Sequence, residues 1–318
     1  MIPTRLTRHR QSRMAAAAGI AGVLVLAGCG GTSSGGAAQL NWYITNPSAS
    51  VFTDAAATCS AASGGAYKIK VQYLPSDADG QRQQLVRRLA AGDSSLDILG
   101  LDVTWTPEFA EAGWIQPWPE AQANQVRNGT LETSLKTGTY KNQLYSAPLN
   151  TNTQLLWYRK DLVPTPPKTW DEMIAMSEQL AQQGKPHLIE TQGAQYEGLS
   201  VWFNTMVSSA GGQILNDAGT QSALGPPALT ALKTMQKFAT SVAADPSLSN
   251  QKEDDNRLAF EGGKAAFELN YPFIYPSAKK NAPDLFKNLG YALYPRVVAD
   301  KPSKVTIGGF DLAVSHYS

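Results

Sequence analysis

Histidine and cysteine are scarce in this chain of 318 residues, which contains three histidines and two cysteines. Only His187 and His316 lie beyond the N-terminal leader, too few imidazoles for a typical zinc site or an ordinary Ser-His-Asp triad. The glycine pairs Gly211-Gly212 and Gly308-Gly309 lack the lysine of a phosphate-binding loop and the spacing of a dinucleotide-binding loop. The sequence therefore predicts no metal site, no bound cofactor and no recognisable catalytic constellation.

A long hydrophobic run is also missing. The apolar segment Met14–Leu26, with about 13 residues, is too short to span a bilayer comfortably. Four arginines precede it and small residues follow it, a pattern that predicts an export signal over residues 1–28. The ending Leu26-Ala27-Gly28-Cys29 resembles the bacterial lipobox, whose cysteine is acylated and becomes the mature N-terminus.

The lipobox resemblance implies that Cys29 carries a lipid and that residues 29–39, rich in glycine and serine, form a flexible tether. The folded part is then held at the cell membrane, on its extracytoplasmic side. The alternative is a plain signal peptide that happens to end near a cysteine.

The chain has no large excess of charge of either sign, since its formal net charge is +1. Removal of residues 1–28 takes away four arginines and no acidic residue, which leaves a net charge of −3. A mildly acidic mature chain argues against nucleic acid as a partner. Its length fits roughly two domains.

Strands and helices alternate in the N-terminal half. Apolar or alternating segments predict strands at Leu40–Ile44, Tyr67–Leu74 and Asp97–Val103. Their order predicts an α/β lobe with a parallel sheet, in which ligands collect at the carboxyl ends of strands. The candidate binding residues at these ends are Thr45, Asn46, Asp102 and Trp105. Asp102 serves equally well as the N-cap of a helix that begins near Pro107.

The stretch Gln143–Leu162 places two extended segments, Gln143–Leu149 and Gln154–Tyr158, around the polar residues Asn150-Thr151-Asn152. On local sequence alone, an ordinary hairpin is the better interpretation. The α/β patterns before and after it favour a crossover between two lobes instead. In that case Asn152 faces a ligand cleft, with neutral amide donors and acceptors.

The second half again places polar and aromatic residues beside strand ends. Glu253 begins a helix, where an acidic residue also complements the helix dipole. Tyr271 follows the predicted strand Ala265–Asn270, and Gly309 and Phe310 lie in the predicted strand Thr306–Val314. We predict a first lobe from residues 40–149 and 306–318, and a second lobe from residues 150–305.

Three parts of the sequence resemble family 1 extracellular solute-binding proteins of ABC importers. They are Tyr145–Pro148 with Gln154–Met173, then Phe260–Phe267, and finally Ile307-Gly308-Gly309. The runs Leu101–Thr106, Thr151–Arg159 and Lys304–Gly309 are similar to those of the trehalose-binding lipoproteins of mycobacteria. The resemblance implies an α/β, two-lobe periplasmic-binding-protein fold with a ligand cleft between the lobes. It also implies a disaccharide ligand, ABC permease subunits as partners, and a monomeric head.

The resemblance implies ligand contacts at Asp102, Asn152, Glu253 and Tyr271. Weaker candidates are Thr45, Asn46, Trp105, Gly309 and Phe310. Tyr271 stands where the trehalose-binding relatives have tryptophan, and Phe310 where they have another apolar residue. These two changes leave the identity of the sugar open.

Members of the family continue past the strand Thr306–Val314, whereas this chain ends at Ser318. We therefore expect a C-terminal truncation that leaves both lobes incomplete. If Cys29 is acylated, Cys59 is the one remaining thiol, and the resemblance implies that its disulfide partner lies downstream.

The predicted function is that of a lipid-anchored substrate-binding protein of an ABC transporter, without enzymatic activity, that binds trehalose or a related disaccharide for import. Maltose-like oligosaccharides and glycerophosphodiesters are the alternative ligands. A surface lipoprotein glycosidase and a structural or adhesion lipoprotein are alternatives from other classes. The 26 acidic residues leave a glycosidase pair of carboxylates open.

Overall fold

The computed structural model describes residues 36–45 and 50–318, and its strands form two main sheets and one short hairpin. The first sheet has the order β2-β1-β3-β11-β6. Strand β1 is parallel to β2 and β3, whereas β11 lies antiparallel between β3 and β6. The strands are β1 (Ala38–Ile44), β2 (Tyr67–Tyr73), β3 (Ile98–Asp102), β6 (Ser146–Asn152) and β11 (Gly308–Val314).

Two helices of the first lobe, α2 and α3, begin where a side chain or a proline suits a helix N-terminus. Asp77 caps α2, since its carboxylate accepts a hydrogen bond from the Gly80 N–H at 3.1 Å. Proline in the first turn of α3 needs no N–H partner there. Leu85 and Leu89 of α2 are fully buried in the first core. The elements are α1 (Val51–Ala62), α2 (Ala78–Ala90), α3 (Thr106–Glu111), α4 (Glu120–Arg127), α5 (Glu132–Thr137), β4 (Thr139–Tyr140) and β5 (Gln143–Leu144).

The second sheet has the order β10-β7-β9-β8, in which β9 is antiparallel to β7 and parallel to β8. Its strands are β7 (Leu155–Arg159), β8 (Leu188–Glu190), β9 (Ala265–Asn270) and β10 (Leu289–Ala292). The helices are α6 (Trp170–Gln182), α7 (Glu197–Ser209), α8 (Pro226–Ala239), a 3-10 turn (Leu248–Asn250), α9 (Glu253–Glu261), α10 (Ile274–Asn281) and α11 (Pro283–Phe286).

Trp170 packs against three other aromatic rings in the core of the second lobe. Its ring centroid lies 5.4 Å from that of Phe238, 6.0 Å from that of Trp202 and 6.2 Å from that of Tyr294. Thr169 caps α6 by accepting a hydrogen bond from the Glu172 N–H, and this fixes where Trp170 enters the core. The first lobe has its own core around β3 and α2. Two separate cores agree with the predicted two-lobe α/β fold.

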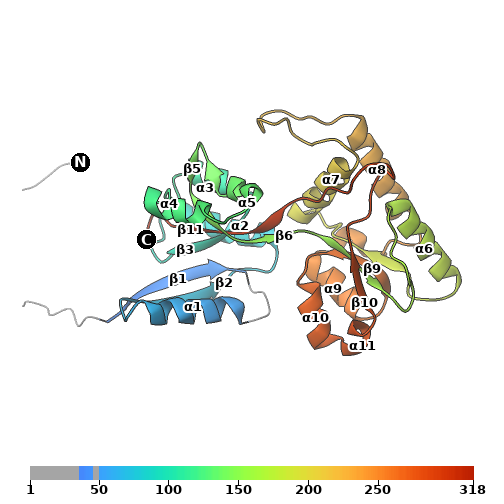
Figure 1. Cartoon of the computed structure of the whole chain (residues 1–318), viewed down its shortest axis with the longest axis horizontal. Helices are drawn as coiled ribbons and strands as arrows, with labels where there is room; N and C mark the ends of the chain where they lie inside the picture. The colour runs from blue at the N-terminus through green and yellow to red at the C-terminus, as the bar shows by residue number, and fades with distance from the viewer. Residues whose placement is uncertain (1–35, 46–49) are drawn as a thin grey trace, which may run out of the picture. The chain divides into compact units, whose positions relative to one another are not determined.

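Strands β6 and β11 connect the lobes and lie side by side in Figure 1. The chain leaves the first sheet at the end of β6 and enters the second sheet at β7. Because β6 pairs with β11 and not with β7, the predicted crossover is confirmed and the hairpin alternative is wrong. One correction concerns Asn150-Thr151-Asn152, which form the end of β6 and not a bend, since they pair with Phe310, Gly309 and Gly308.

The return strand starts later than predicted, at Gly308 and not at Thr306. Thr306 is held by α7 instead: its N–H donates to the Thr205 hydroxyl at 3.1 Å, and its hydroxyl accepts from the Asn204 amide at 2.9 Å. The predicted lobe boundaries remain a proposal. The export signal, most of the tether, Cys29 and Asn46 lie outside the described residues.

Cys59 is exposed on α1 and forms no disulfide within the described residues. In that same part of the chain, every helix is too short or too polar to cross a membrane.

Candidate functional site

Three neighbouring strands of the first sheet bring four of the predicted residues together. Strand β3 ends at Asp102, and Phe310 of β11 pairs with Asp102 on one side and with Asn150 of β6 on the other. The Asn150 side-chain oxygen accepts the Phe310 N–H at 2.9 Å, which ties the two connecting strands to each other. Asp102, Asn152, Gly309 and Phe310 therefore lie where the first lobe passes into the second. We call this place the interlobe site.

Asp102 is not the cap of the following helix, because the N-cap of α3 is Trp105. Its Oδ1 instead accepts two hydrogen bonds from Thr104, one from the backbone N–H at 2.9 Å and one from the hydroxyl at 2.7 Å. Its Oδ2 has no hydrogen-bond partner within residues 36–45 and 50–318. Burial raises the pKa of Asp102, and the bonds from Thr104 oppose this. The carboxylate is oriented through Oδ1, and Oδ2 remains able to accept a hydrogen bond.

Trp105, one of the weaker candidates, lies in the first core. Its side chain is 5% exposed and stacks on Phe109 in the first core, with ring centroids 6.1 Å apart. A ring covered in this way offers no free face, so we withdraw Trp105 from the candidate site. Thr45 directly follows β1 and is half-buried, and its contact with a ligand stays a prediction.

Asn152, Gly308 and Tyr271 meet beside the connecting strands. Gly308 pairs with Asn152, and a Cβ at Gly308 would lie 3.5 Å from the Tyr271 ring and 3.9 Å from the Asn152 Cβ. Gly309 has φ of +128°, and any side chain there would collide with the Asn150 carbonyl. The two glycines thus let the strands and the Tyr271 ring approach closely. A ligand contact of Gly309 itself stays a prediction.

Asn270 holds Glu253 and Tyr271 close together. It is the last residue of β9, and its side chain donates to the Glu253 carbonyl at 2.9 Å and accepts from the Tyr271 N–H at 2.9 Å. Glu253 is the first residue of α9. Burial raises the pKa of Glu253, which the nearby Tyr196 hydroxyl opposes. A strand end and a helix start thus place one carboxylate and one phenol at the interlobe site.

Sequence reasoning missed Tyr196 and Glu197 at the start of α7. Glu197 is half-buried, and its carboxylate forms no hydrogen bond within the described chain. Burial and then the negative charges of Asp102, Glu253 and Asp79 raise the pKa of Glu197 to about 8. Burial and then the charge of Glu253 raise the pKa of Tyr196. The charges of two predicted site residues, Asp102 and Glu253, thus affect the pKa of Glu197. An acidic residue in a first helical turn, as at Glu253, was the available signal.

One ion pair joins the lobes within the described residues. Lys252, the N-cap of α9, lies 3.2 Å from the Asp77 carboxylate at the start of α2. The Lys252 ammonium also lies 5.2 Å from the centroid of the Tyr196 ring. The Lys252 ammonium is therefore engaged by Asp77.

A second polar group is buried inside the second lobe, away from the connecting strands. Glu190 of β8 and Glu268 of β9 are register partners, and both are fully buried. Glu190 accepts from Gln251 at 2.6 Å, and Glu268 accepts from Asn270 at 2.6 Å. Oε1 of Glu190 and Oε2 of Glu268 have no hydrogen-bond partner among the residues that the structure describes. Burial raises the pKa of Glu190 to about 7 and that of Glu268 well above its usual range.

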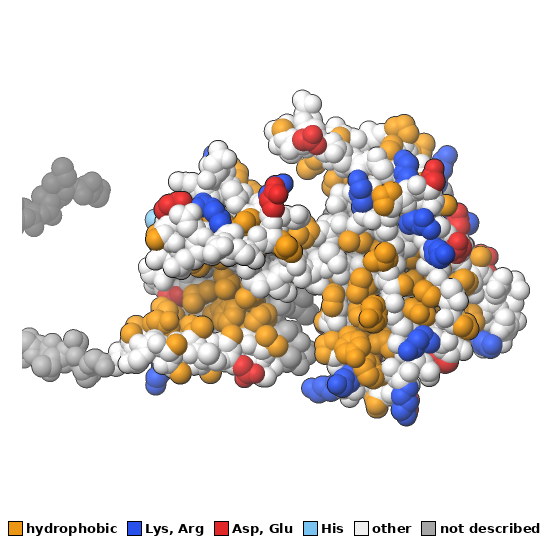
Figure 2. Space-filling view, viewed as in Figure 1, with side chains coloured by type: hydrophobic (Ala, Val, Ile, Leu, Met, Phe, Trp, Pro, Cys, Tyr) orange, Lys and Arg blue, Asp and Glu red, His pale blue; other side chains and the backbone are white. Residues whose placement is uncertain are grey.

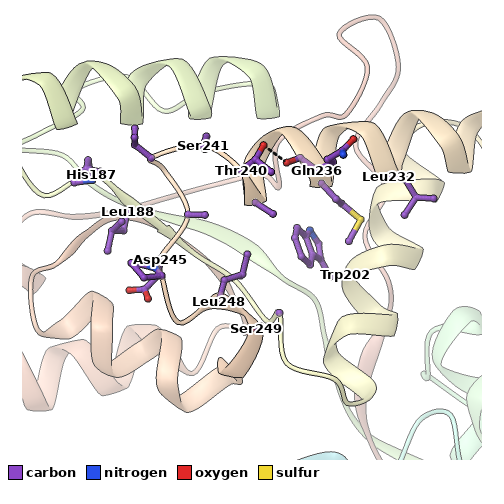
Figure 3. Close-up of a pocket in the computed structure, with 16 residues that line it drawn as sticks. His187, Leu188, Trp202, Leu232, Gln236, Thr240, Ser241, Asp245, Leu248 and Ser249 are labelled. Atoms are coloured by element: carbon purple, nitrogen blue, oxygen red, sulfur yellow. Dashed lines mark hydrogen bonds between the residues drawn. The ribbon is translucent and has the colours of Figure 1, made fainter.

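A separate open pocket lies elsewhere in the second lobe (Figure 3). Its wall comes from α8, from residues 241–249 and from Trp202. His187 and Asp245 are its titratable groups, and the rest of the lining is largely apolar. Figure 2 shows hydrophobic side chains gathered on the face of the second lobe. Two exposed apolar residues belong to β10 and the segment after it, since Tyr291 is 67% and Leu293 is 81% exposed. Neither surface brings several polar groups together as the interlobe site does.

The described residues contain no group of three or more His, Cys, Asp or Glu side chains that could hold a metal ion. The interlobe site instead offers carboxylate acceptors, amide and phenol groups and two aromatic rings, those of Tyr271 and Phe310. This set can bind a hydroxyl-rich molecule by hydrogen bonds and ring contacts.

Comparison with known proteins identifies a matching family, and solved structures with the same fold agree with it. The model of bacterial extracellular solute-binding proteins matches residues 49–318. A probable ABC transporter-binding protein of Deinococcus radiodurans is 27% identical over 261 residues, which are 79% of this chain and 61% of that protein. The chain spans half the length of the putative binding proteins of Brucella that it also matches.

Two solved structures share the fold. Maltose-bound MalE3 of T. maritima superposes with a TM-score of 0.80 at 24% identity, over 89% of this chain and 73% of that one. An ABC transporter solute-binding protein of Thermotoga lettingae, bound with α-D-tagatose, gives a TM-score of 0.79 at 25% identity, over 89% and 74% of the two chains.

Proposed function

The chain belongs to the family of bacterial extracellular solute-binding proteins, and on this basis we propose that it binds a disaccharide for import by an ABC transporter. The observation that carries the proposal is the interlobe site. Asp102, Glu253 and Asn152 offer polar groups to a ligand there, and Tyr271 lies beside them. The relatives named above bind maltose or tagatose or are named as binding proteins of ABC transporters, which supports a sugar as ligand.

The chemistry of the site suits a sugar. Each sugar hydroxyl both donates and accepts, and hydrogen bonds to carboxylates are stronger than those between neutral groups. Apolar ring faces of the sugar can lie against Tyr271 and Phe310. A buried polar group left without a partner costs about 1–3 kcal/mol, so a site of this kind discriminates between sugars without any reaction. Trehalose and related disaccharides are our first choice of ligand.

The connecting strands give the lobes a means of closing. Domain closure around a ligand requires a few residues that absorb changes in φ and ψ. Strand β11 has an irregular register between Phe310 and Asp311, and Gly309 precedes it at positive φ. We propose that these residues act as the hinge and that closure is what the permease recognises.

A thermal-shift screen of the purified chain tests the proposal. Trehalose, maltose, maltotriose and glycerophosphocholine would each be added at millimolar concentration, because a ligand that binds only the native state raises the melting temperature. We expect trehalose or a related disaccharide to give the largest increase. An increase with glycerophosphocholine alone would move the ligand to the glycerophosphodiester class. Chromatography of the incubated sugar would show intact disaccharide, and hydrolysis products would establish the glycosidase alternative.

We also propose that Cys29 is acylated, so that the head works at the cell membrane as a monomer beside the permease subunits. The basis is the run Leu26-Ala27-Gly28-Cys29 behind an apolar segment. Metabolic labelling with a palmitate analogue should mark the full chain in a bacterial host. Labelling that persists in Cys29→Ala would contradict this assignment.

A further inference from the structure

Two fully buried side chains of β9 are connected to the interlobe site by hydrogen bonds. Glu268 and Asn270 are two residues apart in this strand, so their side chains lie on the same face of the sheet. Both residues are 0% exposed. Glu253 and Tyr271, the two candidate ligand contacts beside them, are only half-buried. A ligand can therefore reach Glu253 and Tyr271, whereas Glu268 and Asn270 lie behind them in the protein.

Both polar atoms of the Asn270 side chain have partners. The NH₂ group donates to the Glu253 carbonyl at 2.9 Å and to Oε1 of Glu268 at 2.6 Å. The side-chain oxygen accepts from the Tyr271 N–H at 2.9 Å. Because two of these partners require a donor and one requires an acceptor, a single orientation of the amide satisfies all three. One buried amide thus ties the backbone of Glu253 to that of Tyr271.

The Glu268 carboxyl has a single hydrogen-bond partner in the part of the chain that the structure describes, and this partner is the Asn270 amide. Its other oxygen is buried without a partner. Burial of such a group is costly, and an apolar side chain of similar volume would fill the same space without this cost. A buried polar group with an unused oxygen needs an explanation, and orientation of Asn270 provides one.

We propose that Glu268 is a positioning residue of the sugar site. It orients the Asn270 amide, and that amide holds the two backbone segments from which the Glu253 carboxylate and the Tyr271 ring reach the ligand. This inference rests on the proposed function and adds to it two residues that do not touch the sugar. The role requires an acceptor oxygen at position 268 but no charge, so it suits a neutral disaccharide.

Two substitutions at position 268 differ chiefly in the presence of this acceptor. Glu268→Gln keeps an oxygen that can accept from Asn270, whereas Glu268→Met has a similar volume and no oxygen. In calorimetry with the sugar selected by the thermal-shift screen, Glu268→Met should bind about fivefold more weakly or worse, and Glu268→Gln within about twofold of the wild type. Rescue by glutamine is a result that lost packing alone would not produce. Equal affinity in both variants would overturn the positioning role.

Glu190→Met is the matched control. Glu190 is the register partner of Glu268 in β8 and is equally buried, but its carboxyl accepts from Gln251 and not from Asn270. The substitution removes a buried carboxyl of the same kind and should leave the affinity within about twofold of the wild type. An equal loss of affinity in Glu190→Met and Glu268→Met would overturn the inference, because a generally weakened fold would then explain both.

Combined substitutions test whether Glu268 acts through Asn270. Asn270→Ala should weaken sugar binding by itself, and Glu268→Met added to it should change the affinity by no more than about twofold, since residues that act through one another are not additive. Fully additive losses would overturn the route through Asn270. Thermal melts would show that the variants fold, and Glu268→Leu replaces Glu268→Met if the latter does not.

Hydrogen exchange followed by NMR provides a readout that needs no ligand. The Tyr271 N–H donates to the Asn270 side chain, so its exchange rate reports how firmly the amide is held. We expect exchange at Tyr271 to be roughly tenfold faster in Glu268→Met and unchanged in Glu268→Gln. Unchanged exchange in Glu268→Met would overturn this inference and leave the proposed function intact. Absence of binding by every sugar in the wild type would overturn the proposed function, and with it any role of Glu268 in sugar binding.

Discussion

Asp102→Asn is expected to weaken the binding of the sugar at least tenfold while the melting curve stays nearly unchanged. The asparagine oxygen can still accept both hydrogen bonds from Thr104, so the turn after β3 should persist. The substituted atom is the free Oδ2, which becomes an N–H₂ group and can no longer accept a hydroxyl. Loss of one hydrogen bond to a charged group costs about 1.5–3 kcal/mol, or roughly ten- to a hundredfold in affinity.

Glu253→Gln should likewise weaken the binding of the sugar without changing the melting curve. Residue 253 is held in place through its backbone carbonyl, so the substitution does not disturb its position. The Asn270 amide binds the Glu253 carbonyl, which the substitution leaves in place. Glu120→Gln is the matched control in the first lobe, where the exposed Glu120 pairs with Arg127. Calorimetry with the sugar selected by the screen gives the dissociation constants. Wild-type affinity in both Asp102→Asn and Glu253→Gln would show that the interlobe site is not the binding site.

The crossover could be predicted because it depends on order along the chain. Alternating strands and helices before Gln143 and after Leu162 require the chain to change sheets in between. The strand boundaries could not be predicted equally well. Asn150-Thr151-Asn152 are polar and suit a bend, yet they lie in β6 because β11 supplies their hydrogen-bonding partners. That partner is about 160 residues away in sequence, so no local pattern contains it.

In the candidate site, too, some residues can be recognised from their neighbours in the sequence, and others only from contacts with distant elements. Asp102 and Glu253 could be found because a strand end or a helix start is visible in the sequence. Glu197 has the same local signal, but its raised pKa depends on burial and on the charges of Asp102 and Glu253, which belong to other elements. Trp105 illustrates the opposite case. An indole beside a carboxylate suggests a sugar platform, whereas the ring turns into the first core and stacks on Phe109.

The carboxylates of the interlobe site and those of Glu190 and Glu268 differ in their access to solvent. At the interlobe site Asp102 is half-buried, so a ligand can reach its carboxylate. Glu190 and Glu268 are fully buried in adjacent strands, where no ligand reaches them. Their unpartnered oxygens therefore bear on the stability of the fold. This difference leads to a prediction about stability that is independent of the ligand.

The free energy of unfolding should fall as pH rises from about 4.5 to about 7, in part because of Glu190. Burial raises the pKa of Glu190 from 4.5 to about 7, while Gln251 opposes the shift and the charge of Asp245 adds to it. The native state thus binds the proton more tightly than the unfolded chain. The stability that Glu190 contributes is fully present below its pKa in the unfolded chain. It is lost as pH rises through its pKa in the folded protein. The shift corresponds to about 3 kcal/mol.

Glu190→Gln should remove this part of the pH dependence. The new amide can still accept from Gln251, and its N–H₂ group is expected to face the unpartnered Oε2 of Glu268. We expect the variant to be more stable than the wild type by about 2–3 kcal/mol at pH 8, and similar to it at pH 5. Urea unfolding at pH 5, 6, 7 and 8 provides the comparison.

The difference between the two stability curves separates Glu190 from Asp311, whose pKa burial raises to about 7 and which titrates in both proteins. Glu268 does not cancel in this way, because the charge of Glu190 is one cause of its raised pKa, so the difference includes the effect of the substitution on Glu268. Glu178→Gln, on an exposed glutamate, should leave the curve unchanged. Parallel curves for the wild type and Glu190→Gln would mean that Glu190 stays ionised in the folded protein. The partner of its free oxygen would then have to be water or an ion, and the paired strands β8 and β9 would enclose a charged carboxylate in place of a protonated one.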